Sequence, residues 1–262
     1  MNFCNQYQTV CFRDVKLGEL SKEVISIIFI HGGAWVDPTN TANDFKEFSG
    51  YLNNLFDQLK MSEDSLISMF GINYRLSPRV KHPVHLLDVI NSIFNIVKNH
   101  KINNIYLVGH SVGATLIWQI LSFDFTSNLA NSELSSKVKY IIKNVRGVFL
   151  LDGIYSIDNL LKEFPDYSSF VSKAFTTTQD FIEPAPAIES FKNNTTEHIK
   201  IYLVHSYQDE LLSLNQIKLF MQVLMDNDIP FQLELSNFGL HNEVYKNKLV
   251  AQYIYHNIIH VQ

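Results

Sequence analysis

The chain has 262 residues, of which 46% are hydrophobic and 18% are charged, and its formal net charge is −5. This length suits one large α/β domain or two small ones. No dense run of Lys or Arg occurs, which argues against nucleic acid or a membrane surface as the main partner. The first 16 residues lack the apolar core of a signal peptide, and no apolar run approaches a membrane span. Cys4 and Cys11, the only cysteines, could pair but make neither a disulfide framework nor a zinc site, so we expect a cytoplasmic protein.

Apolar periodicity predicts strands and helices that alternate along the chain. The predicted strands are residues 7–12, 23–30, 66–74, 105–108, 145–151, 199–204 and 231–235. The predicted helices are residues 43–60, 85–97, 114–121, 214–225 and 250–258. Such alternation implies an α/β fold with a mostly parallel central sheet and helices on both faces.

We expect one domain over residues 1–262, because the chain has no internal repeat, low-complexity tract or convincing linker. The stretch from Ile154 to Lys200 lacks a clear strand and is rich in Phe, Ser and Thr, so it is predicted to be a small cap insertion. Functional residues are expected at the carboxyl ends of the strands, where sites gather in parallel sheets.

The strongest motif is Gly109-His110-Ser111-Val112-Gly113, which lies between a predicted strand and an apolar helix. A G-x-S-x-G pattern in this context is typical of a nucleophile elbow, which exposes the serine hydroxyl on a tight turn. With only three fixed positions the motif is weak alone, and the competing interpretation is a plain glycine turn. The elbow interpretation makes Ser111 the candidate nucleophile.

A serine nucleophile needs a base, and the base needs an acid that fixes its tautomer. His241 follows the last predicted strand and is the candidate base, although a surface histidine is the alternative. Asp209 follows the preceding strand and is the favoured acid, since the Ser–acid–His order is that of α/β hydrolases. Asp152 also ends a strand and stays open as the acid. The competing roles are a helix N-cap for Asp209 and an Asp-Gly turn for Asp152.

The segment His31-Gly32-Gly33-Ala34-Trp35 follows a strong apolar strand. Negative charge that develops on a carbonyl oxygen needs backbone N–H groups already aimed at it. We expect Gly33 and Ala34 to donate such groups, Gly32 to shape the turn, and Val112 to add another N–H.

No cofactor and no metal ion are expected. The chain contains neither G-x-x-x-x-G-K-[ST] nor G-x-G-x-x-G, so no phosphate loop is indicated. It also lacks H-E-x-x-H and any closely spaced Cys/His cluster.

These segments resemble a known family. His31-Gly32-Gly33-Ala34-Trp35 matches the HGGxW motif of kynurenine formamidases, within the wider esterase group related to hormone-sensitive lipase, and the segment from Asn73 to Pro78 looks like that group's YRLxP segment. The elbow, Asp152-Gly153, the segment around Asp209-Glu210 and Gly239-Leu240-His241-Asn242 extend the resemblance over nearly the whole chain.

The resemblance implies an α/β-hydrolase fold and hydrolysis of N-formyl-L-kynurenine to kynurenine and formate, in tryptophan breakdown toward NAD. It implies Ser111 as nucleophile, Asp209 as acid and His241 as base. Trp35 and the aromatic cap are then expected to form the apolar wall for the substrate ring.

Two other functions compete: a general carboxylesterase for small acyl esters, and a catalytically inert receptor for small molecules. The receptor is disfavoured because candidates for all three catalytic residues are present. The expected partner is a small-molecule substrate, not nucleic acid or membrane. A monomer is the simplest expectation, with a dimer left open.

Overall fold

The computed structural model describes residues 9–13, 23–58, 65–100, 102–195 and 199–259. Within these residues the frame is a seven-stranded sheet in the order β1-β3-β2-β4-β5-β6-β7. The strands are β1 (Thr9–Arg13), β2 (Glu23–Ile30), β3 (Ser65–Ile72), β4 (Asn104–His110), β5 (Val145–Leu151), β6 (Lys200–Ser206) and β7 (Phe231–Ser236). Neighbouring strands run parallel, except that β1 pairs antiparallel with β3 at the edge.

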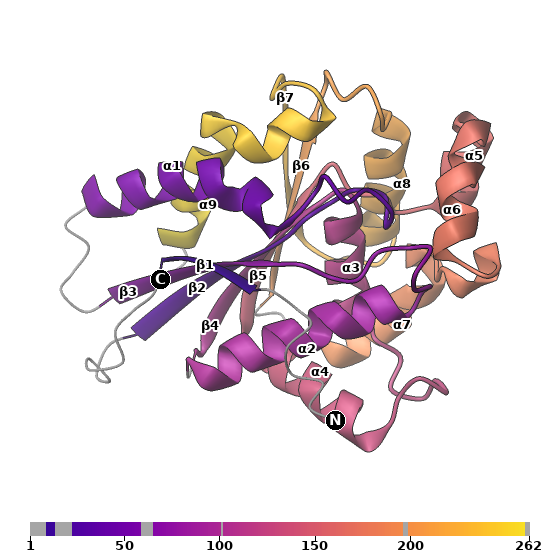
Figure 1. Cartoon of the computed structure of the whole chain (residues 1–262), viewed down its shortest axis with the longest axis horizontal. Helices are drawn as coiled ribbons and strands as arrows, with labels where there is room; N and C mark the ends of the chain where they lie inside the picture. Colours follow the sequence, from indigo (N-terminus) through magenta and orange to yellow (C-terminus); the bar gives the residue numbers. More distant parts are fainter. Residues whose placement is uncertain (1–8, 14–22, 59–64, 101, 196–198, 260–262) are drawn as a thin grey trace.

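Helices cover both faces of this sheet (Figure 1). One face packs under α1 (Phe45–Gln58) and α9 (Lys248–Ile259). The other lies against α2 (Val84–Asn99), α3 (Val112–Leu121), α4 (Ser132–Asn144), α7 (Pro184–Asn194) and α8 (Leu214–Met225). Successive strand residues point to opposite faces. Accordingly, Leu107 lies in the core cluster with α3, and its neighbours Tyr106 and Val108 lie in the cluster with α1 and α9.

The segment between β5 and β6 is helical. It contains α5 (Ile157–Glu163), α6 (Ser168–Ala174) and α7, with the 3₁₀ turns η3 (Pro165–Tyr167) and η4 (Thr178–Asp180) between them. In Figure 1, α5 and α6 stand at the side of the sheet near α8. Two further 3₁₀ segments, η2 (Ala42–Asp44) and η5 (His241–Lys246), precede α1 and α9.

The predicted α/β class and the mostly parallel sheet are confirmed. Each predicted strand and helix is present, with ends that differ by a few residues, and residues 7, 8, 59 and 60 lie outside the described part of the chain. Helix α4 and the separate helices between Ile154 and Lys200 were not predicted from the sequence. Among the described residues, no helix combines the length and the apolar character that crossing a membrane requires.

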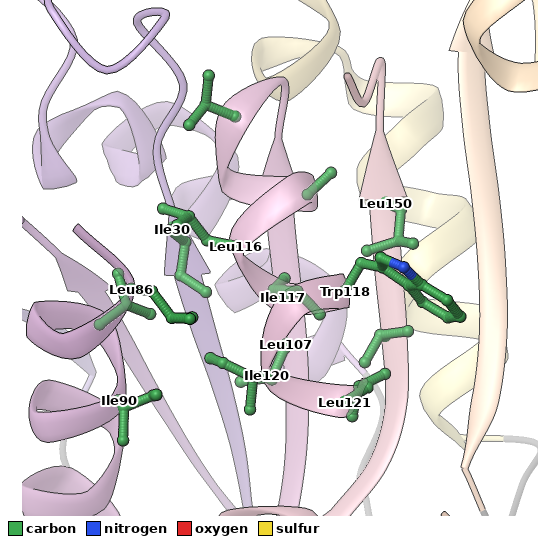
Figure 2. Packing of buried hydrophobic residues seen from close by; sticks show 14 of the residues in the cluster. Ile30, Leu86, Ile90, Leu107, Leu116, Ile117, Trp118, Ile120, Leu121 and Leu150 are labelled. Atoms are coloured by element: carbon green, nitrogen blue, oxygen red, sulfur yellow. The ribbon is translucent and has the colours of Figure 1, made fainter. Parts of the chain in front are cut away.

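Helix α3 lies at the centre of the larger core cluster. All of its residues except Gln119 are buried, as expected for a helix that is apolar on nearly all sides. Figure 2 shows its side chains between α2 and the strands β2, β4 and β5. Trp118 stacks on Phe191 of α7 and meets Phe220 of α8 edge-on, each with ring centroids 4.8 Å apart. This tryptophan therefore joins three helices.

We predict that Trp118→Ala lowers the free energy of unfolding by about 3–5 kcal/mol, the usual cost of truncating a buried aromatic side chain. Chemical denaturation measures it. Leu249→Ala on α9 is the control, because Leu249 is 57% exposed and its truncation should change little. Equal free energies of unfolding for the two variants would show that packing around Trp118 does not stabilise the fold as described.

Candidate active site

Ser111 occupies a strained turn between β4 and α3. Its backbone has φ 53° and ψ −118°, in a region that residues other than glycine rarely adopt. The turn is tied to the next strand, since Ser111 N donates to the carbonyl oxygen of Leu151 at 2.8 Å. Two glycines make the turn sterically feasible. A Cβ on Gly109 would lie 2.5 Å from backbone atoms of Gly113, and a Cβ on Gly113 would clash with the carbonyl oxygen of Ile30. The structure thus has the geometry of a nucleophile elbow.

The loop after β2 presents backbone N–H groups beside this serine. The carbonyl oxygen of Gly32 accepts from the Tyr74 hydroxyl at 2.7 Å and lies 2.9 Å from Nδ1 of His31. A trans peptide points its N–H opposite to its C=O, so these two donors also fix the direction of the Gly33 N–H. A Cβ on Gly32 would lie 3.0 Å from the Cβ of Ser111, which shows how close the two segments come.

The next peptide is fixed in the same way. The carbonyl oxygen of Gly33 accepts from Val36 N at 2.9 Å and from Asp37 N at 2.8 Å, which sets the direction of the Ala34 N–H. Gly33 and Ala34 both have positive φ, at 91° and 49°. Within the described residues, neither N–H has a hydrogen-bond partner. Both groups are available to an anionic oxygen.

The His241 imidazole is held by Asp209. Its Nδ1 lies 2.7 Å from Oδ2 of Asp209, within hydrogen-bond reach, as expected for an acid that orients the base. The other oxygen, Oδ1, accepts from Leu211 N and Leu212 N, each at 2.8 Å. Asp209 thus orders its own loop with one oxygen and the histidine with the other. The backbone N–H of His241 donates to Oε2 of Glu210 at 2.8 Å, which fixes the histidine further.

His110, the residue before Ser111, contacts both the backbone and the ring of His241. Its Nε2 lies 2.9 Å from the carbonyl oxygen of His241, and the two rings are 4.6 Å apart. A carbonyl oxygen can only accept, so His110 Nε2 carries the hydrogen. Burial, and then the neighbouring His241, lower the pKa of His110 well below its usual value, so it stays neutral.

Asp152, the alternative acid, is fully buried and lies close to Asp209, the acid that faces His241. Its Oδ1 accepts from Ser206 N at 3.0 Å and lies 3.0 Å from Nδ1 of His205. One oxygen of Asp152, one oxygen of Asp209 and a ring nitrogen of His205 lie within 4.8 Å of one another. Burial, and then the Asp209 carboxylate, raise the pKa of Asp152 well above its usual value.

The two carboxyls differ in their donors. Asp209 accepts from two backbone N–H groups and faces the His241 imidazole, whereas Asp152 accepts from one backbone N–H. Hydrogen bonds to a carboxylate favour its charged form. Burial with a single backbone donor, together with the raised pKa, therefore favours the protonated form of Asp152.

Among the described residues, two separate sets of three side chains each lie close enough together to hold a metal ion. The first is His110, Asp152 and His241, and the second is Asp152, His205 and Asp209. Both sets depend on Asp152, and a protonated carboxyl is a poor ligand. Both sets also lie within the hydrogen-bond network that positions His241.

Ser111 and His241 both line a cavity of about 240 Å³. Its other lining residues are Gly33, Ala34, Val36, Asp37, Asn40, Ile154, Tyr167, Phe170, Leu211, Leu212 and Asn242. The expected aromatic wall is present in part, from Tyr167 and Phe170 of the helical segment after β5. Trp35 does not line the cavity: it is 1% exposed and packs edge-on against Phe175, with ring centroids 5.0 Å apart. The interpretation of Trp35 as a direct substrate contact is therefore corrected.

Three supporting residues were missed by the sequence analysis. His110 lies inside the elbow motif, and Tyr74 lies inside the segment with the family resemblance, so both had a local signal. Glu210 was noted only as the neighbour of Asp209 in the segment with the family resemblance, whereas its side chain accepts from the His241 backbone N–H. A side chain that fixes a distant backbone group leaves no periodic pattern in the sequence.

The fold and the strand-end serine, acid and histidine define an α/β hydrolase. Solved esterases share the fold: a butyrate-bound esterase from Thermogutta terrifontis superposes with a TM-score of 0.66 over 97% of this chain and 89% of that chain, at 14% identity. The acetyl ester-xyloside bifunctional hydrolase from Caldicellulosiruptor lactoaceticus gives a TM-score of 0.59 over 95% of this chain and 87% of its own. The family model described as BD-FAE matches residues 14–224.

Sequence relatives narrow the class. A kynurenine formamidase of Meyerozyma guilliermondii is 45% identical over 88% of this chain and 83% of its own length. The kynurenine formamidase of Saccharomyces cerevisiae is 41% identical over 89% of this chain and 88% of its own. The chain belongs to the kynurenine formamidase family, as its motifs suggest.

We predict that in Asp152→Asn the free energy of unfolding falls less with rising pH than it does in wild type. Because the folded pKa of Asp152 is raised above its ordinary value of 3.8, the folded protein retains a proton that the unfolded chain releases. Between these two pKa values stability falls by about 1.4 kcal/mol per pH unit. The stability gained by the variant over wild type should therefore grow as pH rises above 3.8 and level off above the folded pKa.

Denaturation of both proteins from about pH 4 to about pH 8 measures this gain. Glu189→Gln, at an exposed position of α7, is the control for the loss of one acid and should show no such trend. A gain for Asp152→Asn that is constant over this range would show that Asp152 is ionised in the folded protein.

Proposed function

We propose that the protein hydrolyses N-formyl-L-kynurenine to L-kynurenine and formate, with Ser111, Asp209 and His241 as its catalytic residues. The observation that carries this proposal is the identity of 41–45% over most of the chain with fungal kynurenine formamidases. The 2.7 Å contact between His241 and Asp209, in a loop beside the elbow serine, supports the assignment of roles.

In the first half of the reaction, Oγ of Ser111 attacks the formyl carbon and its proton passes to Nε2 of His241. Asp209 fixes the tautomer of the ring and stabilises the imidazolium that forms. The negative charge on the formyl oxygen is stabilised by the N–H groups of Gly33 and Ala34. Val112 adds a third donor, because the first N–H groups of a helix have no partner within it.

The leaving group sets the second requirement. An aryl amine leaves poorly as an anion, so His241 returns its proton to the amide nitrogen as the C–N bond breaks. This step releases kynurenine and leaves a formyl ester on Ser111. Water then attacks the ester with His241 as base, which releases formate and restores the serine hydroxyl.

The cavity suits this substrate in size and lining. Its volume of about 240 Å³ accommodates one aromatic ring with a short side chain, and Tyr167 and Phe170 offer the apolar wall that the ring needs. We assign residues 154–200 to a cap of the single domain, because Ile154, Tyr167 and Phe170 line the cavity from this segment.

We expect the wild-type enzyme to hydrolyse N-formyl-L-kynurenine with a higher kcat/KM than aryl acetate or aryl butyrate esters. A formyl carbon carries only hydrogen, whereas longer acyl groups need room near the N–H donors of Gly33 and Ala34. Ser111→Ala is the matched control, because it removes only the hydroxyl oxygen. It should fold normally and lose several powers of ten in turnover, about 10⁶-fold by analogy with other serine hydrolases.

Steady-state kinetics on the three substrates decides between the candidate functions. Ester hydrolysis without any hydrolysis of the formamide would establish a carboxylesterase instead. Binding without turnover of any of them would establish a receptor. A folded Ser111→Ala variant with wild-type turnover would refute the role of Ser111.

A further inference from the structure

The cavity has an uneven distribution of charge. Asp37 is the only carboxylate among its described lining residues, and neither Lys nor Arg is among them. Most of the remaining wall is apolar or carries neutral amides and hydroxyls. Such a cavity favours a ligand with a positive charge near Asp37 over one with a negative charge there.

The Asp37 carboxylate is oriented by its own turn. Its Oδ1 accepts from the backbone N–H of Thr39 at 2.8 Å and from the Thr39 hydroxyl at 2.7 Å. Among the described residues, no side chain or backbone donor binds its Oδ2. One oxygen is therefore used by the fold, and the other is available to a ligand.

Asp37 is also fixed relative to the reacting groups. Its backbone N–H donates to the carbonyl oxygen of Gly33 at 2.8 Å, and this same contact sets the direction of the Ala34 N–H. One loop thus carries both the donors for the developing oxyanion and a carboxylate at the cavity wall. Asp37 is only half-buried, so its charge does not bear the full cost of desolvation.

We propose that Asp37 binds the α-ammonium group of the substrate, and that this contact selects aryl formamides with a free amino-acid tail. The inference rests on the proposed function, since the substrate of that reaction carries an ammonium several bonds from the formyl carbon. With no cation in the described wall, the α-carboxylate of the tail is placed toward solvent, near the exposed lining residue Asn242. The tail is then recognised through its positive end.

The test compares two substrates in two variants. One substrate is N-formyl-L-kynurenine, and the other is the same molecule without the α-amino group. Asp37→Asn removes the charge and keeps an Oδ1 for both Thr39 contacts, so the turn is preserved. Glu189→Gln removes one negative charge at an exposed position of α7 and is the matched control.

The measured quantity is the ratio of kcat/KM for the substrate with the ammonium to that for the substrate without it. We expect Asp37→Asn to lower this ratio about tenfold, mostly through KM, because a hydrogen bond to a charged group contributes about that factor. Glu189→Gln should leave the ratio unchanged. An unchanged ratio in Asp37→Asn would overturn the proposal, whether or not the separate rates fall.

A second measurement needs no variant. Added salt screens a half-exposed charge pair, so the wild-type ratio should fall as ionic strength rises. A ratio independent of salt would count against Asp37. The absolute rates separate the two proposals: if wild type hydrolyses both formamides equally well, the function stands and the assignment of Asp37 fails. If it hydrolyses neither formamide, the proposed function itself fails.

Discussion

The site depends on the close approach of two backbone segments: the first turn of α3 and the end of β2. A Cβ on Gly113 would clash with the carbonyl oxygen of Ile30, so only glycine permits this distance. The approach places the loop that follows Ile30 beside Ser111, with a Cβ on Gly32 only 3.0 Å from that of the serine. Donors for an oxyanion and the candidate nucleophile are thus brought together by backbone packing. Side chains then refine the geometry, as Tyr74 does at the Gly32 carbonyl.

The two strand-end acids show how environment separates similar groups. Asp209 accepts from two backbone N–H groups at one oxygen and faces Nδ1 of His241 with the other. Asp152 is buried with fewer donors and close to the Asp209 carboxylate, so its pKa is raised. A raised pKa at Asp152 makes a second buried negative charge less favourable. The same principle keeps His110 neutral beneath His241.

Much of the fold could be predicted from the sequence, because buried parallel strands are continuous apolar runs and their order places polar residues at one edge. The elbow and the loop after β2 were also predictable, because glycines at the end of a strand indicate that another backbone segment approaches closely. Trp35 was misassigned since periodicity and motif position do not reveal which way a side chain points, and it packs against Phe175. The roles of Glu210 and His110 depend on contacts between distant segments, which spacing along one chain does not show.

The most direct test of the site is to compare kcat/KM on N-formyl-L-kynurenine for Asp209→Asn and Asp152→Asn. Both changes replace one oxygen by an amide nitrogen of similar size. At position 209 the amide faces Nδ1 of His241 and forces the wrong tautomer, so we predict a loss of about 10⁴-fold. At position 152 the amide keeps an oxygen that can accept from the Ser206 N–H and does not face His241, so most activity should remain. A large loss at 152 with activity retained at 209 would contradict this account.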